Sequence, residues 1–140
     1  TLRGLRILVS SGEPLDPDLA RRVLEQLPAT RLLNTYGTSE IWDATCEEVA
    51  DVPADAPRIP VGRPLPYARC YVLDAGLQLQ PPGVPGELWI GGDGLGDGYW
   101  RRPDLTAARF CAVPGLPDAR LYRTGDAARF LADGRLEILG

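Results

Sequence analysis

The chain has 140 residues, enough for one compact core, and a net charge of -4 in which all 15 basic residues are arginine. The arginines are scattered or paired rather than clustered, which argues against nucleic acid as a partner, and no apolar run approaches the roughly 18 residues of a membrane span. Three cysteines, Cys46, Cys70 and Cys111, have no metal-binding spacing and are expected to be reduced core thiols. We therefore expect a cytoplasmic protein without a membrane partner.

The first part of the chain predicts a strand, a helix and a second strand. Leu5 to Ser10 is a short apolar run typical of a buried strand, and Arg31 to Tyr36 is the second. Between them, Asp16 is a natural helix cap, and the apolar positions Leu19, Val23, Leu24 and Leu27 share one face until Pro28. Such βαβ-like units place ligand sites beyond the carboxyl ends of their strands.

The composition of the sequence changes near residues 50 to 60, where a proline-rich stretch begins. Short β patterns dominate from there on, with one helical segment, Leu105 to Phe110, and a hairpin turn at Asp133-Gly134. The expected strands are residues 69–74, 86–91, 120–122, 128–131 and 135–139. The predicted fold class is α/β plus β, with an αβ layered part over residues 1–50 and a small distorted β-barrel over residues 51–140.

The segment from Asn34 to Glu40 lies where the second predicted strand ends and is rich in polar side chains. It contains Asn34, Thr35, Tyr36, Gly37, Thr38, Ser39 and Glu40. Tyr36 can stack on an adenine ring that Asn34 hydrogen-bonds, Thr38 and Ser39 can donate to phosphate oxygens, and Glu40 can hold Mg²⁺. A polar turn that merely closes a strand is the alternative for these seven residues alone.

Two further segments can also be interpreted either as parts of a ligand site or as ordinary structural elements. Leu121 to Asp126 places a carboxylate, Asp126, where it can accept both hydroxyls of a ribose, and Gly86 to Tyr99 is a glycine-rich stretch. Taken singly, the first is also an ordinary turn and the second an ordinary strand.

Four ordered segments together resemble the adenylation domains of nonribosomal peptide synthetases, in the superfamily of adenylate-forming enzymes. They are Ser11 to Leu15 (SGEPL), Asn34 to Glu40 (NTYGTSE), Gly86 to Phe110 (GELWIGGDGLGDGYWRRPDLTAARF) and Leu121 to Asp126 (LYRTGD). The resemblance covers essentially the whole chain. It implies ATP-dependent activation of a carboxylic acid, expected to be an amino acid, and transfer to the phosphopantetheine of a peptidyl carrier protein domain.

The resemblance also implies roles for individual residues. Gly12, Glu13 and Pro14 would line the adenine pocket, with Tyr36 flanking the ring. Asp126 would bind the ribose, Ser39 the α-phosphate and Glu40 the Mg²⁺, so that Ser39 and Glu40 are the catalytic candidates. Val9, Ser11 and Thr35 would line the pocket that selects the acid.

Some positions depart from the family pattern. Thr38-Ser39 replaces the usual Pro-Thr but keeps a hydroxyl, the stretch from Glu40 to Thr45 is one residue shorter than is common, and Ile138 stands where many relatives have an aromatic residue. The lysine-bearing phosphate loop and the carboxylate-contacting lysine of the family would lie before and after this chain, so we expect an internal piece that is inactive alone.

Two alternatives stay open at the level of the sequence. One is an acyl- or aryl-CoA ligase of the same superfamily, and the other is a noncatalytic nucleotide-binding or interaction module that kept the fold. The residues alone do not name the acid.

Overall fold

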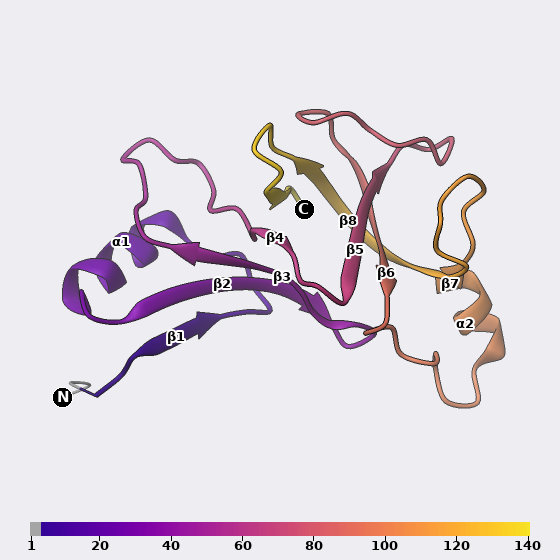
Figure 1. Ribbon diagram of the computed structural model, residues 1–140, viewed down its shortest axis with the longest axis horizontal. Helices are drawn as coiled ribbons and strands as arrows, with labels where there is room; N and C mark the ends of the chain where they lie inside the picture. The colour runs from indigo at the N-terminus through magenta and orange to yellow at the C-terminus, as the bar shows by residue number, and fades with distance from the viewer. Residues whose placement is uncertain (1–3) are drawn as a thin grey trace.

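The computed structural model describes residues 4–140, which form two β-sheets with two helices (Figure 1). The first sheet has the strand order β1-β2-β3-β4. Its strands are β1 (Ile7–Ser10), β2 (Arg31–Thr38), β3 (Trp42–Val49) and β4 (Arg63–Pro64). The second sheet has the order β5-β6-β8-β7, with β9 also paired to β8. Its strands are β5 (Ala68–Leu73), β6 (Gly86–Gly92), β7 (Phe110–Cys111), β8 (Leu121–Phe130) and β9 (Leu136–Ile138).

The predicted βαβ-like unit is present, because β1 and β2 pair in parallel and α1 (Pro17–Gln26) connects them. The Asp16 carboxylate accepts a hydrogen bond from Leu19 N at 2.9 Å, which satisfies one of the free amide groups at the start of α1. Ala20 is fully buried against the first sheet, in a cluster that includes Leu32 and Val49.

Two details of this unit differ from the expectation. The first strand is not buried, since Ile7 and Val9 are 46% and 52% exposed, because β1 is the edge strand of its sheet. Leu19, which the periodicity places on the packed face of the helix, is 49% exposed, and α1 packs on the sheet through Ala20, Val23 and Leu24 instead.

The sequence did not predict β3, which turns back from β2 and pairs with it antiparallel. The second predicted strand is confirmed as β2, which extends two residues beyond its predicted end at Tyr36, and residues 39–41 form the turn. Gly37 is required at the register shift between the two strands, because a Cβ there would lie 1.8 Å from Trp42 O.

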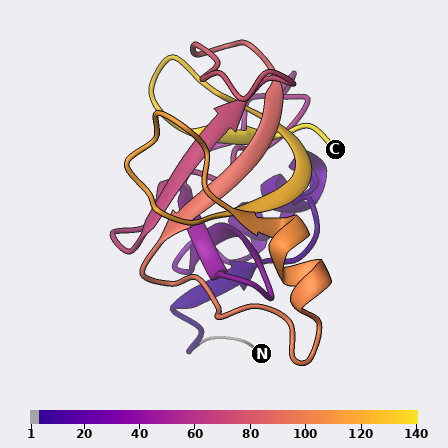
Figure 2. The same cartoon turned by 90° about the vertical axis from the view of Figure 1, so that its right-hand side faces the viewer.

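The second sheet follows the predicted β pattern, with α2 (Pro103–Arg109) close to the expected helix. Figure 2 views this sheet from its own side, with α2 in orange. The two strands expected at 120–122 and 128–131 are one long strand, β8, since Gly125 forms a bulge within it and not a turn. The Asp133-Gly134 hairpin is confirmed, with Leu131 N donating to Arg135 O at 2.7 Å.

One apolar cluster joins the two sheets. Ile41 and Val61, which adjoin strands of the first sheet, pack with Val72, Ile90 and Leu136 of the second sheet. All five side chains are nearly or fully buried. The αβ layered part and the curled β part thus share a core, and the predicted fold class is confirmed. The exact division at residue 50 stays a prediction.

Candidate functional site

A groove of about 590 Å³ lies where the two sheets meet. Three of the predicted segments contribute to its wall: the loop after β1, the second half of β2 and the middle of β8. The lining residues that the sequence also singles out are Gly12, Glu13, Pro14, Asn34, Thr35, Tyr36, Gly37, Asp126 and Ile138. Residues far apart in the chain are therefore assembled around one space large enough for a small ligand.

The central contact in this groove joins Tyr36 and Asp126. Tyr36 Oη donates a hydrogen bond to Asp126 Oδ2 across 90 positions of sequence. Burial, and then the bond to this carboxylate, raise the pKa of Tyr36, so its hydroxyl remains a donor at neutral pH. The pair presents an aromatic face and a carboxylate side by side.

Asp126 owes its position to the bulge in β8. The register between β6 and β8 shifts here, with Glu87 opposite Ala127 and Trp89 opposite Arg123. Thr124 Oγ1 donates to Leu88 O at 2.7 Å and accepts from Asp126 N at 3.0 Å. Gly125, with φ of 88°, permits the turn of the backbone that aims Asp126 at the groove.

Asn34 and Thr35 lie at the floor of the groove. Asn34 is 1% exposed, and its Nδ2 donates to Pro60 O at 2.9 Å. Its amide nitrogen therefore already has a hydrogen-bond partner within the protein. Thr35 is 8% exposed, and within residues 4–140 its hydroxyl has no hydrogen-bond partner. A buried hydroxyl without a partner is costly unless a ligand or water completes it.

Thr38, Ser39 and Glu40 lie beyond the groove, at the turn between β2 and β3. Ser39 is exposed, and Thr38 Oγ1 accepts from Glu40 N at 3.3 Å. Glu40 Oε1 accepts from Tyr99 Oη at 2.5 Å. Burial opposes the charge of Glu40, but the hydrogen bonds from Tyr99 and Thr38 outweigh it and lower the pKa of this carboxyl.

The other two predicted pocket residues are outside the groove wall. Val9 is half-exposed on β1, and Ser11 is exposed and donates to Asp43 Oδ1 at 3.3 Å. Their role toward an acid stays a prediction, as do the roles of the residues that line the groove.

The sequence missed part of the groove wall. Pro57, Arg58, Ile59 and Val61 line it, yet they belong to the stretch that the sequence indicates only as a connection. Arg58 brings a cation to the wall, and the signal that could have identified it is an arginine between two prolines, Pro57 and Pro60.

The described residues form no cluster of metal ligands and no membrane-spanning helix. Among residues 4–140, no group of three or more His, Cys, Asp or Glu side chains could hold a metal ion. Glu40 still fits Mg²⁺, which proteins commonly bind through one carboxylate together with phosphate oxygens of a substrate. No described helix is long and apolar enough to cross a membrane.

The comparisons with known proteins agree with this geometry. The family described as AMP-binding enzyme matches residues 1–100. The chain belongs to the AMP-binding enzyme family. It is 48% identical to phosphinothricin tripeptide synthetase PhsB of Streptomyces viridochromogenes over 143 residues, and 49% identical to a dimodular nonribosomal peptide synthase of Bacillus subtilis over 145 residues. The two alignments cover 97% and 99% of this chain.

Solved structures place the chain in the same family. It superposes on PA1221, an NRPS protein containing adenylation and PCP domains, with a TM-score of 0.92 and 34% identity over 99% of the chain. It also matches AB3403, a four-domain nonribosomal peptide synthetase bound to AMP and glycine, with a TM-score of 0.83 and 46% identity over 94% of the chain. The resemblance to adenylation domains drawn from the four motifs is confirmed.

The chain spans only a small part of the length of these proteins. It covers 11% and 6% of the two sequence relatives, and 29% and 10% of the two solved chains.

Proposed function

We propose that the groove binds ATP, and that the protein carrying this chain activates a carboxylic acid as an acyl-adenylate for a carrier domain. The observation that carries the proposal is the groove between Tyr36, Asp126 and the loop at Gly12 to Pro14. Family membership supports it, as does a similar synthetase that was solved with AMP and glycine.

The adenosine would lie against Tyr36, with the backbone of Gly12, Glu13 and Pro14 along the adenine. The Asp126 carboxylate has further lone pairs besides the one that Tyr36 uses, and these accept the ribose hydroxyls. Ile138 lies in the same wall and supplies an apolar surface where relatives have an aromatic ring.

The phosphates would extend toward the β2–β3 turn. Ser39 is exposed there and can donate to an oxygen of the α-phosphate, with Thr38 beside it. The lowered pKa of Glu40 keeps this carboxylate ionised at neutral pH, as a ligand for Mg²⁺ requires. The bound ion would neutralise charge on the phosphate oxygens.

In the reaction, a carboxylate oxygen of the acid attacks the α-phosphorus, the new O–P bond forms, and pyrophosphate leaves with the electron pair of the broken bond. The thiol of a carrier phosphopantetheine then attacks the acyl carbonyl, and AMP leaves. No side chain in this chain acts as a nucleophile. Its residues hold two anions in line, a kind of positioning whose loss costs about 10²- to 10³-fold in rate per donor.

Thr35 supports an uncharged acid as the substrate. Thr35 lines the groove and carries no charge, and the other pocket candidates, Val9 and Ser11, are also uncharged. We propose a neutral amino acid. The carrier partner is supported by the similar protein that contains adenylation and PCP domains.

The proposal is tested by acid-dependent exchange of pyrophosphate into ATP. The full-length protein that carries this chain is incubated with labelled pyrophosphate, ATP, Mg²⁺ and single acids from a panel of amino and aryl acids. We expect exchange with one neutral amino acid or a few related ones. A folded protein that exchanges with no acid would refute the enzymatic function, and a preference for Lys, Arg, Asp or Glu would refute the assigned acid class.

A further inference from the structure

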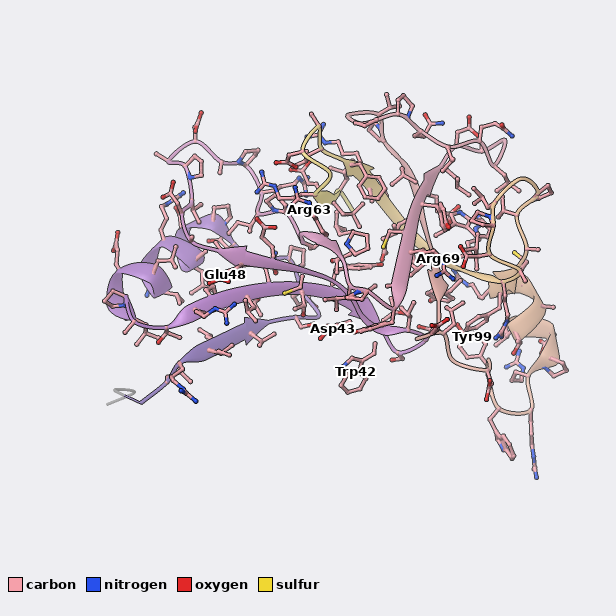
Figure 3. The ribbon with its side chains drawn as sticks, in the orientation of Figure 1. Trp42, Asp43, Glu48, Arg63, Arg69 and Tyr99 are labelled. Carbon is pink, nitrogen blue, oxygen red and sulfur yellow. The ribbon has the colours of Figure 1, made fainter. Side chains whose placement is uncertain are left out.

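The glycine-rich segment between β6 and α2 forms two hydrogen bonds with Glu40. Gly96 N donates to Glu40 O at 2.7 Å, and Tyr99 Oη donates to Glu40 Oε1 at 2.5 Å. The first contact fixes the backbone and the second fixes the carboxylate. In Figure 3, Tyr99 lies beside α2, near the end of the β2–β3 hairpin.

Tyr99 is itself held in place by α2 and by an aromatic cluster. Its backbone N donates to Thr106 Oγ1 at 2.9 Å, and its ring packs edge-on against Phe110 with centroids 5.8 Å apart. Phe110 packs in turn on Tyr122, at 5.2 Å. The preceding residue must be glycine, because Gly98 has φ of 125° and a Cβ there would lie 2.4 Å from Thr106 Cγ2.

Arg120 holds the same part of the glycine-rich segment that bonds Glu40. Its guanidinium donates to Gly96 O at 3.0 Å and to Asp97 O at 2.8 Å, and it lies over the Phe110 ring at 4.4 Å. The same arginine therefore holds both the segment that bonds the backbone of Glu40 and the ring that supports Tyr99. These contacts leave the Tyr99 hydroxyl little freedom.

We propose that Tyr99 is a positioning residue, whose hydroxyl orients the Glu40 carboxylate toward the divalent cation of bound Mg²⁺-ATP. The inference rests on the proposed function, in which Glu40 is the metal ligand. In this proposal, the glycine-rich segment serves to hold Tyr99 in place against the Glu40 carboxylate, a role that the motif alone does not indicate.

The geometry leaves room for a cation. A carboxylate offers about four lone-pair sites. Tyr99 uses one on Oε1, and with the contacts from Thr38 and Tyr122 the Glu40 carboxylate still keeps a site for a metal. A carboxylate that is already oriented loses less conformational freedom when it binds the ion. Removal of the hydroxyl should therefore weaken metal-assisted ATP binding and leave the remaining contacts to ATP intact.

The test measures ATP binding to the full-length protein by equilibrium dialysis, over a Mg²⁺ series and in EDTA. For Tyr99→Phe, which keeps the ring against Phe110, we expect the Mg²⁺ concentration for half-maximal ATP binding to rise about threefold to tenfold. The Kd for ATP in EDTA should be unchanged. Tyr71→Phe is the matched control, because it removes a similar hydroxyl-to-carboxylate bond, from β5 to Asp118, away from Glu40. We expect it to leave both quantities unchanged.

Glu40→Gln, alone and combined with Tyr99→Phe, separates the two claims. If Glu40→Gln alone leaves the Mg²⁺ dependence unaltered, the metal role within the proposed function is wrong. If Glu40→Gln raises the Mg²⁺ requirement but Tyr99→Phe behaves as the wild type, the proposed function stands and the positioning role is refuted. The positioning role predicts that Tyr99→Phe has no added effect in the Glu40→Gln background, whereas a general structural role predicts equal losses in both backgrounds, with and without Mg²⁺.

Discussion

At the scale of single residues, the proposed nucleotide site depends most on the carboxylate of Asp126. It lines the groove, accepts the Tyr36 hydroxyl, and is aimed by the bulge at Gly125. Both Tyr36 and Asp126 were predicted from the sequence through a resemblance between motifs. Their hydrogen bond was not predicted, because no local pattern joins residues 90 positions apart.

Asp126→Ala should weaken ATP binding by about tenfold to a hundredfold. Hydrogen bonds to a charged acceptor contribute roughly 1.5 to 3 kcal/mol each, and water recovers part of the loss. Equilibrium dialysis of the full-length protein measures the change, with Asp133→Ala in the exposed β8–β9 hairpin as the control. A normal Kd for ATP combined with an altered preference among acids would remove Asp126 from the ribose site.

Tyr36→Phe should keep most of the affinity for ATP but reduce the discrimination between ATP and its 2′-deoxy and 3′-deoxy analogues. The ring that flanks adenine remains, whereas the hydroxyl that orients Asp126 is lost. The ratio of Kd values for ATP and each analogue measures this. Equal ratios in variant and wild type would show that Tyr36 does not orient the carboxylate.

At the scale of elements, the sequence predicted the βαβ-like unit well, since the Asp16 cap and the short apolar strands are local signals. It missed β3, whose polar residues Asp43, Thr45, Glu47 and Glu48 obscure the strand pattern. It divided β8 because a glycine in Thr124-Gly125-Asp126 resembles a turn. Both errors concern strands bent by bulges, where pairing with a distant strand decides the conformation.

Gly37→Ala should destabilise the β2–β3 hairpin. The added Cβ would lie 1.8 Å from the backbone oxygen of Trp42, so the two strands must separate, at a cost of roughly 1 to 3 kcal/mol or more. Urea unfolding should show a lower midpoint, whereas Gly4→Ala, where the added atom meets open space, should not change it. An unaltered midpoint for Gly37→Ala would contradict the described register.

Asp118 anchors the loop before β8 to the second sheet, and its contribution should depend on pH. Its carboxylate is buried and accepts from Arg69 Nε at 2.7 Å and from Tyr71. The hydrogen bond from Arg69, opposed by burial and reinforced by Tyr71, lowers the pKa of Asp118 from 3.8. The folded state therefore gains stability above the unfolded pKa, and loses this gain as the pH falls through the lowered value.

Asp118→Asn tests this dependence. At pH 7 the variant should be less stable, since the buried carboxyl group loses its charge-assisted hydrogen bonds from the half-exposed Arg69 guanidinium. The difference between the urea midpoints of wild type and variant should shrink as the pH falls below about 3.8. A difference that stays constant across this range would show that the charge of Asp118 does not stabilise the fold.

At the scale of the whole molecule, the candidate site exists because two sheets share one core. The cluster of Ile41, Val61, Ile90 and Leu136 joins the two sheets, and residues of both β2 and β8 line the groove. The sequence identified most of the groove residues through motifs. It could not predict that Arg58 lines the groove or that Tyr99 bonds Glu40, because both depend on how distant loops pack.

The most direct test of the central claim is a crystal structure of the full-length protein with AMP bound, at a resolution that places the nucleotide. The account predicts adenine against Tyr36, between the Gly12 to Pro14 loop and Ile138, with the ribose hydroxyls within hydrogen-bond distance of the Asp126 carboxylate. The phosphate should point toward Ser39. A nucleotide bound elsewhere, with Asp126 still bonded only to Tyr36, would contradict the claim that this groove is the ATP site.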